Sequence, residues 1–189
     1  ALALKGSGLD AILLEARPAG GSVADPRAIA LSYASRLLLE RLGVWSGLTP
    51  ATPIERIHVS QCGGFGSSVL TPEDAGVPVL GYVVEYGALY RALHRALDDN
   101  HFSLRIGARV SGIRARPDEA CAEYERDGKR VTVSARLLVL ADGGALAQQV
   151  EGIACRQTDY GQSALVAQVK TAEPHRGVAY ERFTPDGPL

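Results

Sequence analysis

Residues 1–15, Ala1-Leu-Ala-Leu-Lys-Gly6-Ser-Gly8-Leu-Asp-Ala-Ile-Leu-Leu-Glu15, decide the fold class of this chain. The first five residues match the end of a helix, which Gly6 and Gly8 would close because glycine adopts the left-handed conformation found beyond helix ends. The continuous apolar run before Glu15 predicts a strand buried on both faces, as in a parallel sheet covered by helices. Helix, tight turn and buried strand form, in this order, the second half of a βαβ unit. We therefore expect an α/β fold.

Hydrophobic periodicity predicts the remaining helices and strands. We expect helices over residues 29–42, 87–99 and 145–150, and strands over residues 54–61, 68–71, 81–85, 103–106, 108–115, 137–141, 163–171 and 178–184. A hairpin of residues 120–125 and 130–135 is indicated by Asp127-Gly128, since this dipeptide favours the left-handed conformations of a two-residue loop. Leu137-Leu-Val-Leu-Ala141 is apolar throughout, so it should form a second strand of the buried type.

The composition excludes several classes of function. With 20 basic and 21 acidic residues among 189, the chain lacks the basic excess of nucleic-acid-binding proteins, so no nucleic acid partner is expected. Three cysteines without a CxxC motif and four scattered histidines predict neither a disulfide framework nor a metal site. The longest apolar runs are far shorter than the roughly 20 residues that cross a bilayer. We expect a cytoplasmic protein that could still touch a membrane surface.

Both ends of the chain look truncated. The sequence contains no methionine, and so no start-codon residue. Phe183-Thr-Pro-Asp-Gly-Pro-Leu189 stops at a turn signal, where a following strand would begin. The first strand of the βαβ unit and the turn into its helix would precede Ala1. We therefore expect a fragment of a longer protein.

Charged side chains near the predicted strand and helix ends are the first candidates for a cofactor site. At the carboxyl end of the second strand of a βαβ unit, a carboxylate such as Glu15 can accept hydrogen bonds from the ribose hydroxyls of an adenine dinucleotide. Arg27, in a loop before a helix, could reach a pyrophosphate in bidentate fashion, and Arg17 is a second candidate. An exposed strand-end carboxylate and a solvated arginine at a helix start are the alternatives, and the spacing leaves both interpretations open.

The Asp142-Gly143 turn follows an apolar run, at the kind of strand end where doubly wound sheets place ligand-binding groups. Glycine at this position permits close approach of the backbone to a ligand. A purely structural turn is the alternative. No GxSxG motif, paired carboxylates or metal cluster indicates a hydrolase, and we assign no catalytic acid or base.

Several stretches resemble one protein family in the same order along the chain. They are Glu15-Ala-Arg17, Asp25–Ser32, Leu39-Glu-Arg-Leu-Gly43-Val-Trp45, Ile57-His-Val-Ser60, Gly81–Glu85, Leu138–Gly143, Tyr180-Glu-Arg-Phe-Thr184 and Gly187-Pro-Leu189. Together they closely resemble the FAD-dependent ubiquinone-biosynthesis hydroxylases, which belong with the para-hydroxybenzoate hydroxylase-like flavoproteins. The resemblance covers essentially the whole chain.

This resemblance implies a partial Rossmann-like FAD-binding domain with interleaved strands of a substrate-binding β-sheet. Residues 1–52 and 81–153 would form the FAD-binding part, and residues 54–80 and 156–189 would be pieces of the substrate-binding sheet. The family's GxGxxG motif would lie before Ala1 and its GDAAH-type motif beyond the last residue.

The resemblance also implies roles for individual residues. Glu15 would hold the adenosine ribose, and Arg17 and Arg27 would lie along the ribityl chain and pyrophosphate of FAD. The backbone at Val110 would face the adenine. Asp142 and Gly143 match the family's DG motif, which is linked to flavin and pyridine-nucleotide binding. The motif often continues to a serine and an arginine, whereas this chain continues with Gly144-Ala-Leu-Ala-Gln148.

The implied activity is hydroxylation of an aromatic ring. FAD, reduced by NAD(P)H or another donor, would activate O2, and one oxygen atom would be transferred to a polyprenyl phenol. The long prenyl tail implies contact with other ubiquinone-pathway proteins or with a membrane surface, at the periphery of the inner membrane. Two alternatives stay open: another flavin- or NAD-dependent oxidoreductase, and a non-catalytic interaction fragment.

Overall fold

The computed structural model describes residues 1–20 and 25–189, which divide into two compact units. The first unit consists mainly of Ala3–Gly21 and His101–Leu165. The second consists mainly of Ser22–Asn100 and Val166–Leu189. None of the helices in the described parts of the chain is long and apolar enough to cross a membrane.

Strand β1 (Ile12–Glu15) of the first unit pairs in parallel with β7 (Ser103–Ile106). The 3-10 helix η1 (Leu2–Leu4) precedes β1 in place of the predicted helix end. The parallel pairing is as predicted, but burial of β1 on both faces is wrong. Ile12 is 47% exposed, because β7 is the one strand that pairs with β1 in the described residues.

Strands β8 (Arg109–Ala115), β9 (Ala120–Arg126) and β10 (Lys129–Ala135) form an antiparallel sheet in the same unit. The predicted hairpin joins β9 to β10. Its loop residues Asp127 and Gly128 have φ angles of 51° and 70°, as a two-residue loop between twisted strands requires.

Two predicted strands are wrong. Residues 137–141 and 163–171 form no strand, because no described strand pairs with either run. Apolar residues cannot replace a partner for the backbone N–H and C=O groups. The predicted short helix at 145–150 is reduced to the 3-10 turn η3 (Ala147–Gln149).

The second unit contains an antiparallel sheet in the order β2 (Ala28–Ser32), β6 (Gly81–Glu85), β3 (Ala51–Ile54). The predicted helix over residues 29–42 is therefore wrong in its first part. Residues 28–32 alternate between exposed and half-buried, which suits a strand paired with β6. Helix α1 (Tyr33–Arg41) begins only at the Ser32 cap, whose hydroxyl accepts a hydrogen bond from the Ser35 amide at 3.1 Å.

Helix α3 (Tyr86–Asp99) follows β6 directly and packs its alanine face into the core of the second unit. Ala88, Ala92 and Ala96 recur every four residues and therefore lie on one side of the helix. They pack with Val44, Leu48 and Val84, and the 3-10 helix η2 (Trp45–Gly47) lies between the first two of these.

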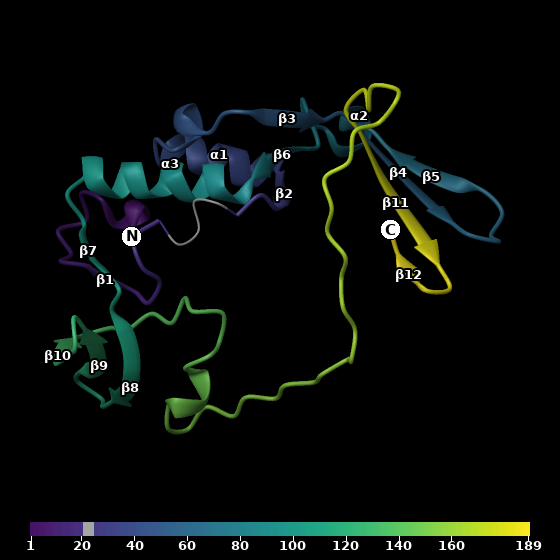
Figure 1. Ribbon diagram of the computed structural model, residues 1–189. Coiled ribbons are helices and arrows are strands. Elements are labelled where there is room, and N and C mark those ends of the chain that lie inside the picture. The colour runs from purple at the N-terminus through teal and green to yellow at the C-terminus, as the bar shows by residue number, and fades with distance from the viewer. Residues whose placement is uncertain (21–24) are drawn as a thin grey trace. The chain divides into compact units, whose positions relative to one another are not determined.

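The other sheet of the second unit has the order β12 (Gly187–Pro188), β11 (Val178–Thr184), β4 (Arg56–Gln61), β5 (Ser67–Leu70). Figure 1 shows the yellow β11 beside the blue β4, two segments far apart in the sequence. They pair in parallel, with Tyr180 opposite His58. The short helix α2 (Pro72–Ala75) follows β5, and its Thr71 cap and Asp74 bond reciprocally.

Candidate functional site

Glu15 and Arg17 form a fixed pair at the carboxyl end of β1. The carboxylate of Glu15 accepts hydrogen bonds from the backbone N–H of Arg17 at 2.8 Å and from Nε of the same residue at 3.1 Å. A third bond joins Nη2 of Arg17 to Oε2 of Glu15 at 3.3 Å. The acid thus orients the guanidinium and anchors the backbone that leaves the strand.

The pair lies next to the start of β8, on which Val110 is located. The carbonyl oxygen of Glu15 accepts a hydrogen bond from the Ala108 amide at 2.9 Å, and that of Arg17 accepts one from the Gly107 amide at 3.2 Å. Val110 follows two residues later and pairs with Tyr124 of β9. The structure therefore brings Glu15, Arg17 and Val110 to the same edge of the first unit.

Arg27 of the second unit is held in the same way as Arg17. Its backbone N–H and its Nε donate to Asp25 Oδ1 at 3.1 and 3.0 Å, and Nη2 donates to Oδ2 at 2.7 Å. The guanidinium also lies 5.3 Å from the centre of the Tyr86 ring, at the start of α3. Within the described residues, Nη1 of Arg27 makes no hydrogen bond, and the side chain is 61% exposed.

Hydrogen bonding between Asp25 and Arg27 shifts the pKa values of both side chains. The side-chain hydrogen bond from Arg27 lowers the pKa of Asp25, and the backbone N–H of Arg27 adds to the effect. The same side-chain contact raises the pKa of Arg27. Both shifts favour the charged forms, so Asp25 and Arg27 form an ion pair.

Asp142 folds back onto the backbone that follows it. Its Oδ1 accepts a hydrogen bond from the Gly144 amide at 3.0 Å, and its Oδ2 accepts one from the Leu146 amide at 2.7 Å. These backbone bonds, the Gly144 bond first, lower the pKa of Asp142. Gly143 has a φ of 78°, a left-handed conformation that suits glycine. The turn leads into η3, which lies against β8 in the first unit.

The predicted site residues are therefore distributed over both units. Glu15, Arg17 and Val110 are neighbours, and the Asp142-Gly143 turn belongs to the same unit. Arg27 belongs to the other unit.

Known sequences add an independent line of evidence. No protein-family model matches the chain. The 3-demethoxyubiquinol 3-hydroxylase of Escherichia coli (strain K12) is 31% identical over 168 residues, which is 87% of this chain and 42% of that protein. Ubiquinone hydroxylase UbiL of Rhodospirillum rubrum is 34% identical over 87% of this chain and 38% of its own length.

This chain is a homologue of the ubiquinone hydroxylases. It spans less than half the length of the curated relatives that it matches. The segments that match include most of both compact units, since the alignments cover 87% of the chain.

Solved structures show the fold of this ubiquinone hydroxylase homologue. The flavin-dependent monooxygenase PieE, in complex with FAD and substrate, matches with a TM-score of 0.62 and 21% identity over 78% of this chain and 29% of that one. A flavoprotein/dehydrogenase from Cytophaga hutchinsonii matches with a TM-score of 0.66 and 10% identity over 95% of this chain and 45% of its own. The fold is the α/β fold of these flavoproteins, as predicted.

Sequence reasoning missed how the two arginines of this homologue are held. Glu15-Ala-Arg17 and Asp25-Pro-Arg27 share one pattern, an acid two residues before an arginine. In both, the carboxylate accepts from the backbone N–H and from the guanidinium of the arginine. For Asp25 the i, i+2 bond could be expected from the sequence, because aspartate side chains commonly bond the backbone two residues ahead. The contact between the Arg27 guanidinium and the Tyr86 ring could not be predicted in this way, because the two residues are far apart in the sequence.

Proposed function

We propose that this chain is part of an FAD-dependent monooxygenase that hydroxylates the aromatic ring of a polyprenyl phenol in ubiquinone biosynthesis. The observation that carries the proposal is the 31% identity to 3-demethoxyubiquinol 3-hydroxylase over 87% of the chain. Because the chain spans 42% of that relative, the activity is proposed for the whole protein.

The side chains present suit the binding of FAD. Glu15 ends a strand that is paired in parallel, and its carboxylate offers acceptors for the ribose hydroxyls. Arg27 offers a charged guanidinium edge for the pyrophosphate. Arg17 would hold the Glu15 carboxylate in place and contribute positive charge. We assign Val110, by its backbone, to the adenine side of the same cofactor.

Asp142 and Gly143 complete the proposed set of cofactor residues. The two backbone bonds of Asp142 fix the shape of the turn, and the left-handed Gly143 leaves its backbone uncovered by a side chain. Residues 1–52 and 81–153 would supply the FAD-binding part. The sheet of β4, β5, β11 and β12 lies wholly within residues 54–80 and 156–189, which supports assigning these segments to the substrate.

When bound, FAD would supply the redox chemistry that activates O2, from which one oxygen atom would go to the phenol ring and the other would leave as water. The residues named above bind and orient the cofactor, and none of them is assigned as an acid or base. We propose NAD(P)H as the electron donor. The sequence also resembles 2-octaprenyl-6-methoxyphenol hydroxylase, so that type of ring belongs among the substrates to be tried. A prenyl tail would require contact with a membrane surface or with other proteins of the pathway.

Spectroscopy and activity of the purified full-length protein test the proposal. We expect flavin absorbance, oxidation of NAD(P)H, and a hydroxylated product from a short-chain prenyl phenol. A colourless protein that gains no flavin absorbance on incubation with FAD would falsify the cofactor assignment. Oxidation of NAD(P)H without a hydroxylated product from any prenyl phenol would instead favour another flavin-dependent oxidoreductase. A protein that neither binds flavin nor oxidises NAD(P)H would favour a non-catalytic interaction protein.

A further inference from the structure

One face of the sheet formed by β4, β5, β11 and β12 carries a row of aromatic side chains. Successive side chains of a strand point to opposite faces, and aligned residues of neighbouring strands share a face. Tyr180 of β11 is aligned with His58 of β4, which is aligned with Val69 of β5. The centroids of the Tyr180 and His58 rings lie 5.6 Å apart, and the ring planes are tilted by 57°. Tyr180 is 69% exposed, so most of its ring is open to a ligand.

A hydrogen-bonding pair follows the aromatic row on the same face. Arg182 is aligned with Ser60, two residues beyond Tyr180 and His58 along the two parallel strands. Nη1 of Arg182 donates a hydrogen bond to Oγ of Ser60 at 3.4 Å. No carboxylate in the described part of the chain forms an ion pair with Arg182. Its remaining N–H groups are therefore available to a ligand.

The distance between the two rows suits a phenol. A strand rises by about 3.3 Å per residue, so rows two residues apart are separated by about 6.6 Å. A phenol ring stacked on the aromatic row carries its oxygen toward the next row, and an N–H donor lies about 2.9 Å beyond an oxygen that accepts from it. Arg182 is thus within reach of the oxygen of a phenol stacked on Tyr180.

The opposite face of the sheet lacks this combination. Among the aligned residues of β11 and β4, Phe183 lies opposite Gln61 there, and Ala179 lies opposite Ile57. The charged side chain between Ala179 and Phe183 is that of Glu181, an acceptor that cannot donate to a phenol oxygen. The face with Tyr180 therefore combines an aromatic pair with a cation, and the other face has neither.

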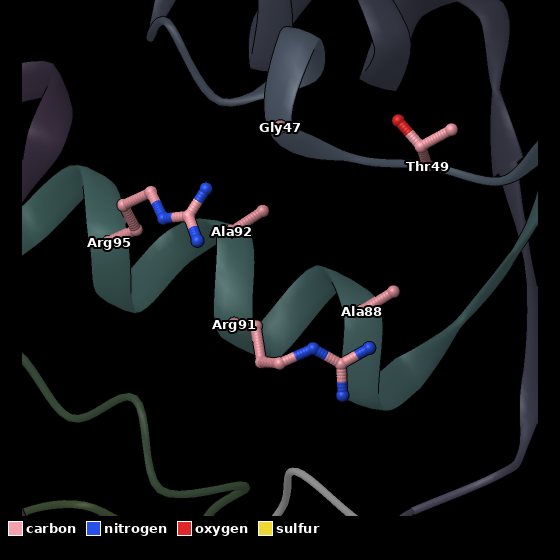
Figure 2. Close-up of a pocket in the computed structure, with 6 residues that line it drawn as sticks. All are labelled: Gly47, Thr49, Ala88, Arg91, Ala92 and Arg95. Carbon is pink, nitrogen blue, oxygen red and sulfur yellow. The ribbon is translucent and has the colours of Figure 1, made fainter.

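The hollow beside α3 shows how such groups can fail to meet. It has a volume of about 90 Å³, and its lining includes Arg91 and Arg95. Figure 2 shows these two side chains extending from α3 on either side of Ala92, so their donors do not converge on one ligand. In the sheet, by contrast, a direct contact joins the two members of each row.

We propose that this face of the sheet binds the phenol ring of the substrate, with the ring stacked on Tyr180 and His58 and the oxygen accepting from Arg182. Aromatic pairs are favourable in tilted and offset arrangements, and a guanidinium donor makes a strong, charge-assisted hydrogen bond. Ser60 holds the guanidinium in position. A methyl group on the phenol oxygen would stand where the guanidinium approaches. The inference rests on the proposed function and names the residues that select a free hydroxyl.

Calorimetric titration of the full-length protein with 2-prenylphenol and with its methyl ether tests Arg182. The wild type should bind the phenol at least about tenfold more tightly than the ether, because the ether loses a charge-assisted hydrogen bond. Arg182→Gln should reduce this preference to less than about threefold. The preference is a ratio of two affinities of one variant, so a general loss of folded protein does not change it. An unchanged preference in Arg182→Gln would overturn the proposal.

A second set of variants tests the aromatic row. Tyr180→Ala should weaken binding of 2-prenylphenol by about three- to tenfold, because the ring contact is lost. Tyr180→Phe keeps the ring and should bind as the wild type does. Phe183→Ala is the matched control, since it removes a partly exposed ring from the other face of the same strand. Equal weakening by Tyr180→Ala and Phe183→Ala would refute the assignment of the face.

These titrations distinguish failure of this inference from failure of the proposed function. If the wild type hydroxylates 2-prenylphenol and all variants bind it equally well, the face is refuted and the proposed function stands. If the protein contains FAD but neither binds nor hydroxylates 2-prenylphenol, the phenol substrate and this face are refuted together.

Discussion

Gly81–Glu85 and Leu137–Ala141 are five-residue runs that both predict a strand, yet only the first forms one. In β6, both edges are paired, by β2 on one side and β3 on the other. Val84 of this run is 2% exposed. In the second run, Leu137 is 76% exposed and Val139 is 73% exposed.

The difference between the two runs shows that apolar content does not by itself make a strand. The less apolar run, with Tyr82 and Glu85, is the buried one. Its backbone groups find partners in two neighbouring strands, and its side chains meet the alanine face of α3. Each run also ends beside a proposed cofactor residue. The amide of Tyr86, which follows the first run, donates a hydrogen bond to the carbonyl oxygen of Arg27, and Asp142 follows Ala141 directly.

The largest expected effect comes from placing a charge in each run. Val84→Asp buries an unpaired carboxylate in the core, so it should lower the free energy of unfolding by at least about 4 kcal/mol or abolish folding. Val139→Asp is the matched change at an exposed position and should cost no more than about 0.5 kcal/mol. Urea unfolding of both variants measures this. Similar losses would mean that residues 137–141 are packed in solution as tightly as β6.

The next effect concerns Arg27, the proposed cofactor residue beside β6. Arg27→Ala should weaken FAD binding of the full-length protein by about 1.5 to 3 kcal/mol, the value of a hydrogen bond to a charged group. Arg41→Ala, which removes an exposed helix arginine of the same unit, should change it by less than about 0.5 kcal/mol. FAD titration gives both dissociation constants. Equal constants would remove Arg27 from the cofactor site.

A smaller effect tests how closely β6 is packed against β2. A Cβ added at Gly81 would overlap the carbonyl oxygen of Leu31, so Gly81→Ala should lower the free energy of unfolding by about 1 to 3 kcal/mol. Gly112 lies in strand β8, where a Cβ would approach Glu123 no closer than 3.9 Å. Gly112→Ala should therefore be nearly neutral. Thermal unfolding compares the stabilities of the two variants. If Gly81→Ala left the stability unchanged, β2 could move away from β6 at little cost in free energy.

The smallest effect is a pH dependence in the turn after the second run. The Gly144 and Leu146 amides hold the pKa of Asp142 below the 3.8 of an ordinary aspartate. A lowered folded-state pKa stabilises the turn at pH values above the unfolded pKa, and this stabilisation is lost as the pH falls through the folded pKa. Both amide signals in NMR spectra should therefore shift only in strong acid. Asp142→Asn should remove the shift, and a midpoint above 3.8 would contradict the two bonds.

Much of the local structure was predictable from the sequence. The hairpin at Asp127-Gly128 and helix α3 occur where periodicity and turn chemistry place them. The spacing of two residues from acid to arginine, in residues 15–17 and 25–27, is also visible in the sequence. The structure shows the hydrogen bonds that this spacing allows. Such features depend on residues within a few positions of one another, so the sequence alone supplies both partners.

The turns, the caps, the α/β class and the homology to the ubiquinone hydroxylases follow from the amino-acid sequence, because each rests on neighbouring residues or on their order. The tertiary structure selected which apolar runs became strands. It made residues 28–32 a strand and left residues 137–141 unpaired. It also paired β4 with β11 across more than a hundred residues. Strand pairs are formed by partners distant in the chain, and no local pattern records where those partners lie.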